Sequence, residues 1–450
     1  MKNLPEEFVV RMKALLGSEY SLYEQAVNSK PVRAYRVNTN KISVEDFMKL
    51  GVLGGERIPY CETGFYLDEE KIGSHPFFHA GMIYVQEPAA MMPAECVDID
   101  PGWNVLDMCA APGGKSSQIR NKLSENSVLV SNEIVPSRCR VLTGNIERMG
   151  FRNTVTTCAD TDRLAALFPK RFDLVTVDAP CSGEGMFRKD DDAVNEWSAE
   201  NVRKCAERQK AILENAAKCV RDGGVILYAT CTFSLEENEM VVDDFLLNHP
   251  EFELVRANKA VEESTCDGVE FDGCRAENIK FCRRFYPHKG KGEGQFAAVL
   301  KSRLSKQSDS KCERKVRKAP DRGVLEFMDS ILTDFEPSHI SFSKDVPVYF
   351  TPDFVVPEKA AFSCGVTVGE IRKGYIQPHH QLFSALGGNF KRKIDLAPDS
   401  DELRKFLHGE SFPCDCGNGW AAVTVCGCAV GGVKAVNGTA KNHYPKGLRQ

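Results

Sequence analysis

The chain has 450 residues, of which 42% are hydrophobic and 27% are charged, and its formal net charge is −5. This length suffices for two or three domains, and the composition excludes collagen, a coiled coil and a wholly disordered chain. No apolar stretch approaches the roughly 18 residues that indicate a membrane span. The first 20 residues contain three glutamates and do not resemble a secretory signal.

The 18 cysteines are the most unusual feature of the composition. Disulfide frameworks belong mainly to short secreted chains that lack an adequate core, whereas this chain has ample apolar residues. We therefore expect most of the thiols to be small, reduced, buried side chains of a cytoplasmic protein. The chain contains no C-x-x-C motif, so the pattern gives no support to thioredoxin-like chemistry.

The N-terminal residues, 1–80, have the pattern of a small α+β module. Phe8, Met12 and Leu15 recur at helical spacing and predict an amphipathic helix at the start. Ala34–Asn40 predicts a short strand, and a zone rich in glycine and proline follows it.

From about residue 105 the pattern becomes a regular alternation of strands and helices. The predicted strands are Asn104–Cys109, Val128–Asn132, Thr154–Cys158, Phe172–Asp178, Gly224–Thr230 and Gln295–Leu300, and the predicted helices are Lys115–Leu123, Pro136–Met149 and Ala199–Val220. This alternation predicts an α/β fold with a doubly wound, Rossmann-like parallel sheet over residues 81–301. Ligands of such sheets bind beyond the carboxyl ends of the strands.

Basic residues concentrate after this alternation. Residues 283–318 contain 12 Lys and Arg against 3 Asp and Glu, and the polar stretch 302–320 is predicted to be a linker. Residues 321–450 form a further region with short strand-like runs, and residues 429–450 contain four basic residues and no acidic one. The overall charge of −5 therefore does not exclude a polyanionic partner.

A loop of small residues, Cys109–Lys115, follows the first strand of the alternation and leads into a helix. Small residues allow a ligand to approach the backbone, and the helix start offers free N–H groups. A phosphate-binding Walker loop would need glycine where Cys109 stands, so we disfavour a nucleotide triphosphatase. Glu133 and Asp160 end the next two strands. Each alone is equally well interpreted as an ordinary loop acid, but together beside this loop they favour an adenosine cofactor without a diphosphate, S-adenosylmethionine.

Two cysteines, Cys181 and Cys231, follow the fourth and fifth strands, and Asp178 ends the fourth. These strands are expected to be neighbours, which would bring both thiols to one pocket. A thiolate that adds to carbon 6 of a pyrimidine activates carbon 5 for methylation, and a nearby acid such as Asp178 can share a proton with the base. On position alone, buried packing remains the favoured interpretation of either cysteine, because 18 cysteines make such placements common.

Three motifs carry a resemblance to a known family. Asp107–Lys115 (DMCAAPGGK), Asp178–Phe187 (DAPCSGEGMF) and Ala229–Phe233 (ATCTF) resemble the Sun/RsmB/RsmF-type RNA 5-methylcytosine methyltransferases. Further segments of residues 1–301 are similar to that family. Lys441–Arg449 (KNHYPKGLR) is similar to the tail of the bacterial RsmF group within it, whose C-terminal region is PUA-like and binds RNA.

The resemblance implies a class I methyltransferase core, an N-terminal RNA-binding module and a C-terminal PUA-like domain. It implies that Cys231 is the nucleophile and that Cys181 serves product release, whereas DNA enzymes would use the cysteine at the position of Cys181. The chemistry of the reaction assigns activation of the base to Asp178. The cofactor contacts that it implies are Cys109, Ala110, Ala111, Pro112, Gly113, Gly114, Lys115, Glu133, Asp160 and Asp178. From the residues alone, we expect Cys109 to be a packing residue.

RNA is the partner that these features favour, and we expect Arg283–Lys291 to contact it more than the linker does. Tyr84, Phe187 and Trp197 are candidate stacking residues, although core packing is the favoured interpretation of each. Four C-terminal cysteines, Cys414, Cys416, Cys426 and Cys428, suggest zinc, but C-x-C spacing is unusual for a structural site, and we predict no metal.

The leading hypothesis is therefore a cytosine-5 methyltransferase that acts on 16S ribosomal RNA of the small subunit, with S-adenosylmethionine as its cofactor. The alternatives are a tRNA cytosine-5 methyltransferase and a catalytically silent RNA-binding assembly factor. The two thiols, the intact cofactor loop and Asp178 argue against a silent protein. We expect no DNA and no membrane partner.

Overall fold

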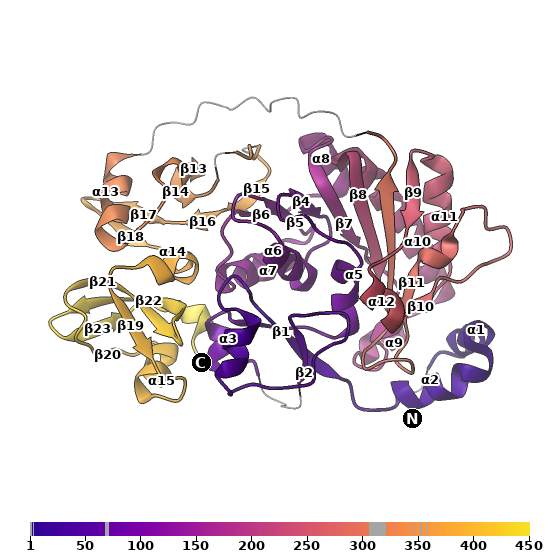
Figure 1. Cartoon of the computed structure of the whole chain (residues 1–450), viewed down its shortest axis with the longest axis horizontal. Helices are drawn as coiled ribbons and strands as arrows, with labels where there is room; N and C mark the ends of the chain where they lie inside the picture. Colours follow the sequence, from indigo (N-terminus) through magenta and orange to yellow (C-terminus); the bar gives the residue numbers. More distant parts are fainter. Residues whose placement is uncertain are drawn as a thin grey trace.

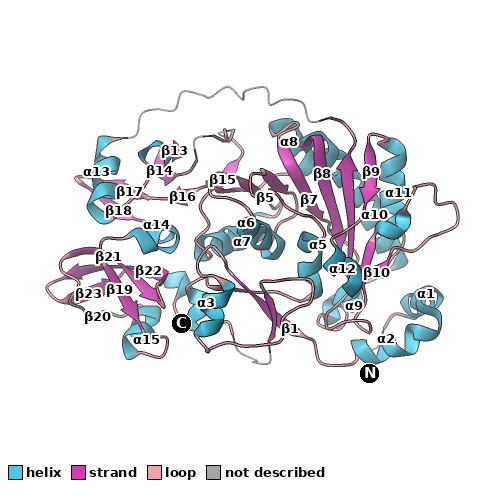
Figure 2. Ribbon diagram, in the orientation of Figure 1, coloured by secondary structure: helices cyan, strands magenta, loops and turns pink. Residues whose placement is uncertain are grey.

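The computed structural model describes residue 2 and residues 4–67, 72–305, 321–343, 345–351, 353–357 and 359–450. A central sheet with helices on both faces occupies the middle of the molecule (Figure 2). The N-terminal helices lie at one end of the molecule and a small C-terminal sheet lies at the other (Figure 1). In the described part of the chain, no helix is both long enough and apolar enough to cross a membrane. Most of the predicted linker, from residue 306 to residue 320, lies outside the described residues.

Five parallel strands form the heart of the central sheet. In spatial order they are β8 (Val220–Thr230), β7 (Phe172–Asp178), β4 (Val105–Asp107), β5 (Leu129–Asn132) and β6 (Thr154–Thr157). Their side chains are buried on both faces: Leu106 packs into one apolar cluster and its neighbour Val105 into the other. Burial on both faces explains the nearly continuous apolar runs in these strands. The connecting helices are α6 (Gly114–Lys122), α7 (Pro136–Arg148), α8 (Thr161–Leu167), α9 (Asp191–Glu196) and α10 (Ala199–Cys219).

The parallel core that the sequence predicts is confirmed, but the complete sheet is mixed. Beyond β8, strand β12 (Gln295–Ser302) runs antiparallel to it. Strand β15 (Ala361–Cys364), from the region after the linker, pairs antiparallel with β6 at the other edge. Both additions cover a sheet edge that would otherwise expose unpaired backbone groups. The remaining elements around this sheet are α11 (Glu239–Asn248), β9 (Phe252–Val255), α12 (Lys259–Ser264), β10 (Cys266–Asp267) and β11 (Arg283–Phe285).

The N-terminal module is joined to the central sheet through buried polar contacts. Arg36 donates hydrogen bonds to Gln86 Oε1 (2.7 Å) and to the carbonyl of Gly114 (2.8 Å), at the start of α6. Asn38 donates to the carbonyl of Met149 (2.9 Å), at the end of α7. The module therefore holds the end of the small-residue loop, where α6 begins, and the end of α7 in place. The elements up to residue 95 are α1 (Glu6–Leu16), α2 (Tyr20–Val27), β1 (Arg33–Val37), α3 (Val44–Lys49), β2 (Gly64–Leu67), α4 (Pro76–His79), β3 (Ile83–Val85) and α5 (Met92–Glu95). Because β3 pairs with β1, the small sheet of the module extends past residue 80.

The C-terminal region packs against the N-terminal module. Tyr35 and Phe77 of the module share one apolar cluster with Phe406 and Val430 of the C-terminal sheet. The buried Lys41 ammonium donates to the carbonyls of Ser384 and Ala429. The elements are α13 (Arg322–Ile331), β13 (Ile340–Ser343), β14 (Val346–Tyr349), β16 (Val366–Thr367), β17 (Gly369–Arg372), β18 (Tyr375–Pro378), α14 (His380–Leu386), β19 (Lys393–Leu396), α15 (Asp401–His408), β20 (Phe412–Pro413), β21 (Gly419–Val425), β22 (Cys428–Val436) and β23 (Thr439–Asn442).

The basic residues at 283–291 are largely used within the protein, which corrects the expectation that they bind RNA. Arg283 and Arg284 are buried, and they pair with Asp267 and Glu239. Lys289 and Lys291 are at the surface, where each pairs with a glutamate of the N-terminal module. Because these cations already have anionic partners, they are poorly placed to neutralise phosphates.

The buried Arg284–Glu239 ion pair joins the sheet to α11, and substitutions at this pair test its contribution to stability. Arg284→Met leaves the Glu239 carboxylate without its partner inside the protein, so we expect the free energy of unfolding to fall by about 3–5 kcal/mol. Removing both charges with Arg284→Met and Glu239→Leu should cost less than the sum of the single changes. Urea unfolding measures these differences.

Arg256→Met is the matched control, because Arg256 is mostly exposed and pairs with Glu262 at 3.1 Å. We expect this control to change stability by no more than about 1 kcal/mol. Equal effects of the two arginine substitutions would contradict a structural role for the buried pair.

Candidate active site

The carboxyl ends of the parallel strands open into one cavity of about 1010 Å³. All of the predicted site residues except Gly113 line it, from the small-residue loop, the ends of β5 and β6, and the segments after β7 and β8. The residues concerned are Cys109, Ala110, Ala111, Pro112, Gly114, Lys115, Glu133, Asp160, Asp178, Cys181 and Cys231. The structure thus brings together the groups that the sequence placed at separate strand ends.

The small-residue loop is fixed by hydrogen bonds to its own backbone. The Ala110 N–H donates to the carbonyl of Asn132 (2.8 Å), and Asn145 Nδ2 donates to the carbonyl of Pro112 (2.9 Å). Gly113 has a φ of 111°, which favours glycine, and a Cβ on Gly114 would lie 3.3 Å from the Gln86 side chain. A larger residue would strain the backbone at Gly113, whereas at Gly114 it would require the Gln86 side chain to shift slightly.

Cys109 belongs to this loop as a packing residue that also borders the cavity. Its side chain packs against the core cluster on one face of the sheet. Burial raises the pKa of its thiol, and the Asp107 carboxyl nearby raises it further. A thiol that stays protonated is a poor nucleophile, which agrees with the expected packing role.

Glu133 and Asp160 present carboxylates to the cavity from two adjacent strand ends. Glu133 is buried; its Oε1 accepts from the Val135 N–H (2.9 Å), and its Oε2 lies 3.2 Å from Arg138 Nη1. Asp160 is exposed and caps α8 by accepting from the Arg163 N–H (2.8 Å). Both side chains are therefore held in fixed positions before any ligand binds.

Lys115 and Asp178 form an ion pair on the cavity wall, with Nζ 2.8 Å from Oδ2. Burial lowers the pKa of Lys115, but the Asp178 carboxylate outweighs this effect and the pKa is raised overall. The Cys231 sulfur also contributes to the increase. Lys115 is thus a permanent positive charge that faces both an acid and a thiol.

The two candidate thiols lie in contact. Cys181 Sγ is 3.3 Å from Cys231 Sγ, and both cysteines are free. The hydrogen bond with Cys231 raises the pKa of Cys181 well above the usual value for a thiol, and burial adds to the effect. One proton shared between two sulfurs favours ionisation of one of them while the other stays protonated.

A buried acid beneath the thiols was not identified from the sequence. Glu237 Oε2 accepts from the Ser182 N–H (2.9 Å) and from Gln209 Nε2 (2.8 Å). Gln209 also donates to the carbonyl of Pro180 (3.1 Å), so the residues on both sides of Cys181 are held. Burial raises the pKa of Glu237 to about 7, although its hydrogen bonds act in the opposite direction. In sequence Glu237 stands within an EENE run that has the pattern of a surface segment.

The remaining sequence candidates take no part in this cavity, apart from Tyr84. Tyr84 lines the cavity but is buried, whereas Phe187 and Trp197 pack in the core beneath α1. Among the described residues, which include all four C-terminal cysteines, no group of three or more His, Cys, Asp or Glu could hold a metal ion. The thiol of Cys428 instead donates to the carbonyl of Lys41 (3.4 Å).

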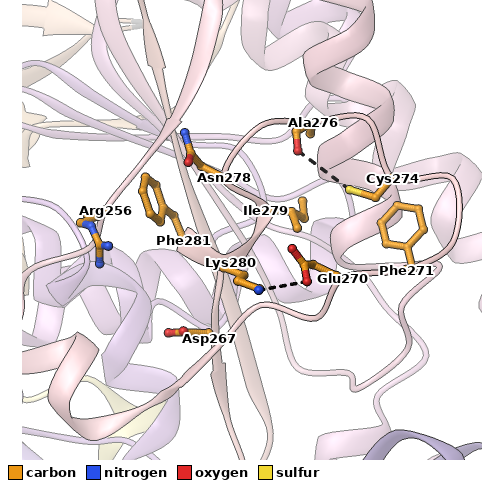
Figure 3. A pocket seen from close by; sticks show the side chains of 10 residues that line it. All are labelled: Arg256, Asp267, Glu270, Phe271, Cys274, Ala276, Asn278, Ile279, Lys280 and Phe281. Carbon is orange, nitrogen blue, oxygen red and sulfur yellow. Dashed lines mark hydrogen bonds and ion pairs between the residues drawn. The ribbon is translucent and has the colours of Figure 1, made fainter.

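A second, smaller cavity of about 490 Å³ lies near β10 and the loop that follows it (Figure 3). An ion pair between Lys280 and Glu270 (3.0 Å) crosses it, and Phe271 and Phe281 contribute aromatic surface. None of its lining residues comes from a strand end of the parallel core. Its composition gives no indication of a particular ligand.

Three family models match successive parts of the chain. Residues 4–88 match the N-terminal domain of 16S rRNA methyltransferase RsmF, and residues 95–301 match 16S rRNA methyltransferase RsmB/F. Residues 393–450 match the methyltransferase RsmF PUA domain. The intervening segment includes the linker and β15.

Whole-length relatives and solved structures agree with these matches. The chain is 32% identical to the ribosomal RNA small subunit methyltransferase F of Vibrio vulnificus strain YJ016, over 99% of this chain and 97% of the relative. The same protein of Erwinia tasmaniensis is 29% identical, over 99% and 96%. A methyltransferase homologue from Pyrococcus horikoshii is 29% identical with a TM-score of 0.59, over 67% of this chain and 96% of that one. The chain therefore belongs to the RsmF family of 16S ribosomal RNA methyltransferases.

Proposed function

We propose that this protein methylates carbon 5 of a cytosine in small-subunit ribosomal RNA, with S-adenosylmethionine as methyl donor and Cys231 as covalent nucleophile. The observation that carries the proposal is the contact of the Cys231 and Cys181 sulfurs, at 3.3 Å, inside the cavity that the small-residue loop borders. Family membership supports the class of substrate.

The cavity suits S-adenosylmethionine. Its size accommodates a nucleoside-sized ligand together with a base, and its lining combines apolar surface with charged side chains of both signs. The buried Glu133 carboxylate is fixed where it can accept hydrogen bonds from ribose hydroxyls, and Asp160 lies one strand further along. When bound, the cofactor supplies an electrophilic methyl group on a sulfonium.

We assign the attack on the base to Cys231. Its thiolate adds to carbon 6 of cytosine, and the electron pair of the 5,6 double bond moves to carbon 5, where the new bond to methyl forms. The resemblance of Ala229–Phe233 to the family motif that carries the nucleophile supports this assignment, and the raised pKa of Cys181, caused first by its hydrogen bond with Cys231, agrees with a thiol at position 181 that stays protonated. Lys115 lies close enough to Cys231 for the sulfur to contribute to the raised pKa of the Lys115 ammonium.

Asp178 and Lys115 stabilise the adduct in this proposal. Negative charge that spreads from carbon 5 towards N3 of the base is neutralised by a proton held between N3 and Asp178. The ion pair with Lys115 fixes the orientation of the Asp178 carboxyl. A preorganised charge of this kind acts without reorganisation during the reaction.

Product release is assigned to Cys181. Loss of the carbon 5 proton to solvent returns its electron pair to the ring, the bond between Cys231 and carbon 6 breaks, and Cys231 leaves as a thiolate. The Cys181 thiol lies where it can donate a hydrogen bond to that departing sulfur. In the overall balance, the carbon–hydrogen bond at carbon 5 is replaced by a carbon–methyl bond and one proton is released. The sulfur–methyl bond of the donor breaks, and its sulfonium would become a neutral thioether.

Serine substitutions separate the two thiols. We expect Cys231→Ser to abolish both turnover and the covalent protein–RNA adduct, because serine does not ionise at neutral pH. Cys181→Ser should instead accumulate the adduct, because release is impaired. A gel assay with RNA and a labelled methyl donor measures both quantities.

Cys158→Ser is the control, because Cys158 lies outside the cavity, and it should behave like the unmodified protein. A Cys231→Ser protein that still forms the adduct would refute the assignment of the nucleophile.

Glu133→Ala tests the cofactor site. Loss of a buried carboxylate that binds hydroxyl groups should weaken S-adenosylmethionine binding by about tenfold or more. Titration calorimetry measures the dissociation constant. Glu125→Ala is the control, because Glu125 is exposed and pairs with Arg152, and it should leave the dissociation constant of S-adenosylmethionine unchanged. Equal affinities of both variants would contradict the placement of the ribose beside Glu133.

The raised pKa of Glu237 predicts that the stability of the folded protein depends on pH. Its pKa is about 7 in the folded protein and 4.5 as the ordinary value, so between these pH values the folded chain keeps a proton that the unfolded chain loses. The free energy of unfolding therefore falls as pH rises from 4.5 to 7, by about 3 kcal/mol from this group.

Glu237→Gln keeps the hydrogen-bond acceptor and removes the charge, so its stability should fall less over that range. Chemical denaturation at each pH measures the difference. Glu207→Gln, at an exposed position on α10, should retain the slope of the unmodified protein. If the slope is the same in all three proteins, Glu237 does not titrate as its surroundings indicate.

A further inference from the structure

We propose that Lys189 and Arg208 form a phosphate clamp at the cavity, which holds the RNA backbone on either side of the cytosine that enters it. Both residues line the cavity that contains Cys181 and Cys231. The inference rests on the proposed function, because it places the backbone of the same RNA whose base reaches the thiols.

The two residues come from different elements that line the cavity. Lys189 stands in the turn before α9, where its N–H donates to the carbonyl of Met186 (2.8 Å), and Arg208 lies in the middle of α10. Both side chains are exposed, whereas Met186 and Ile212 on the same segments contribute apolar surface to the cavity. A base can thus rest on apolar surface while its phosphates meet the two cations.

Pairing distinguishes these two cations from the others nearby. Within the part of the chain that the structure describes, neither Lys189 nor Arg208 forms an ion pair, and neither side chain donates a hydrogen bond. The other basic side chains around the cavity are paired with carboxylates: Lys115 with Asp178, Arg138 with Glu133, and Arg188 with Glu293. Cations without an internal partner are free to exchange their counterions for a phosphate.

Glu293 is an acid of the cavity lining that interacts with the Lys189 charge. Its carboxylate also lines the cavity and is weakly stabilised by the Lys189 charge. It is nevertheless committed to the buried guanidinium of Arg188, at 2.8 Å from Nε. Arg188 therefore neutralises Glu293 and leaves the charge of its neighbour Lys189 available to a ligand.

An extruded nucleotide needs such contacts. Unstacking a base costs free energy, which contacts to the neighbouring phosphates offset while they fix the register of the strand. A carboxylate-rich chain with a net charge of −5 must obtain this attraction locally. Two unpaired cations on the wall beside the reactive thiols provide it at the place where the backbone has to turn.

The test is the salt dependence of RNA binding by the full chain. The probe is protein-free small-subunit ribosomal RNA, transcribed in vitro. The dissociation constant of its complex with the protein is measured over a range of KCl concentrations. Lys189→Ala and Arg208→Ala should each weaken binding and reduce the slope of log affinity against log salt by about 0.7 to 0.9. The double substitution should reduce the slope by the sum of the two effects.

Charge-preserving and matched variants separate the clamp from a structural effect. Lys189→Arg and Arg208→Lys should retain the slope of the unmodified protein. Arg203→Ala removes an exposed arginine from the same helix, α10, but outside the cavity, and should also retain it. With RNA as the varied substrate, the alanine variants should raise KM with little change in kcat, and S-adenosylmethionine binding should be unchanged.

The outcomes are distinguishable from a failure of the proposed function, because binding does not require methyl transfer. Reduced slopes in a protein that transfers no methyl group would support the clamp and refute the reaction. The clamp would be overturned if both alanine variants kept the salt slope of the unmodified protein, or if their slopes changed no more than that of Arg203→Ala. Either result would count whatever the methylation assay shows.

Discussion

The parallel pairing of β7 with β8 is the constraint on which the active site depends. In this register Asp178 lies opposite Ala229, so the two strands end almost level. Cys181 follows three residues after Asp178, and Cys231 two residues after Ala229, which leaves each chain just enough length to turn over the sheet edge. The sulfur atoms then meet at 3.3 Å. A shift of the register by one residue would move both thiols and the acid to the wrong positions.

Buried charges hold the turns that follow these strands. Glu237 fixes the loop of Cys181 from below, and Glu184 accepts hydrogen bonds from the Phe233 N–H (3.0 Å) and the Ser234 hydroxyl (2.9 Å), beyond Cys231. Such groups are expensive to desolvate, and apolar replacements are often as stable. Their presence near both thiols is better explained by positional accuracy than by stability, because each acid holds backbone atoms next to a cysteine that we propose to be catalytic.

The sequence was sufficient for much of this architecture. Strand ends could be located because buried parallel strands are continuous apolar runs. The polar residues that follow these runs, among them Glu133 and Asp178, were therefore predicted to lie at the carboxyl edge of one sheet. The partners of buried charges could not be located, because Arg188 and Glu293 are far apart in sequence and no local pattern pairs them. For the same reason Arg283 and Arg284 had the pattern of an RNA-binding surface, although their cations are neutralised within the fold. Lys189 and Arg208 differ from them in two ways: their side chains are exposed, and they have no ion-pair partner among the residues that the structure describes. Both differences are properties of the folded chain.

The shared core of the two terminal regions has a consequence for how RNA reaches the cavity. The C-terminal sheet, the region that matches an RsmF PUA domain, packs on the N-terminal module through one apolar cluster. That module is in turn joined to the small-residue loop through Arg36 and to α7 through Asn38. Contacts of this kind, apolar and buried, resist the relative motion that polar interfaces between domains allow. RNA held by the C-terminal sheet would therefore reach the cavity of the two thiols at a fixed distance and angle. The choice of cytosine would then depend on the shape of the RNA between the C-terminal sheet and the cavity, as well as on the base itself.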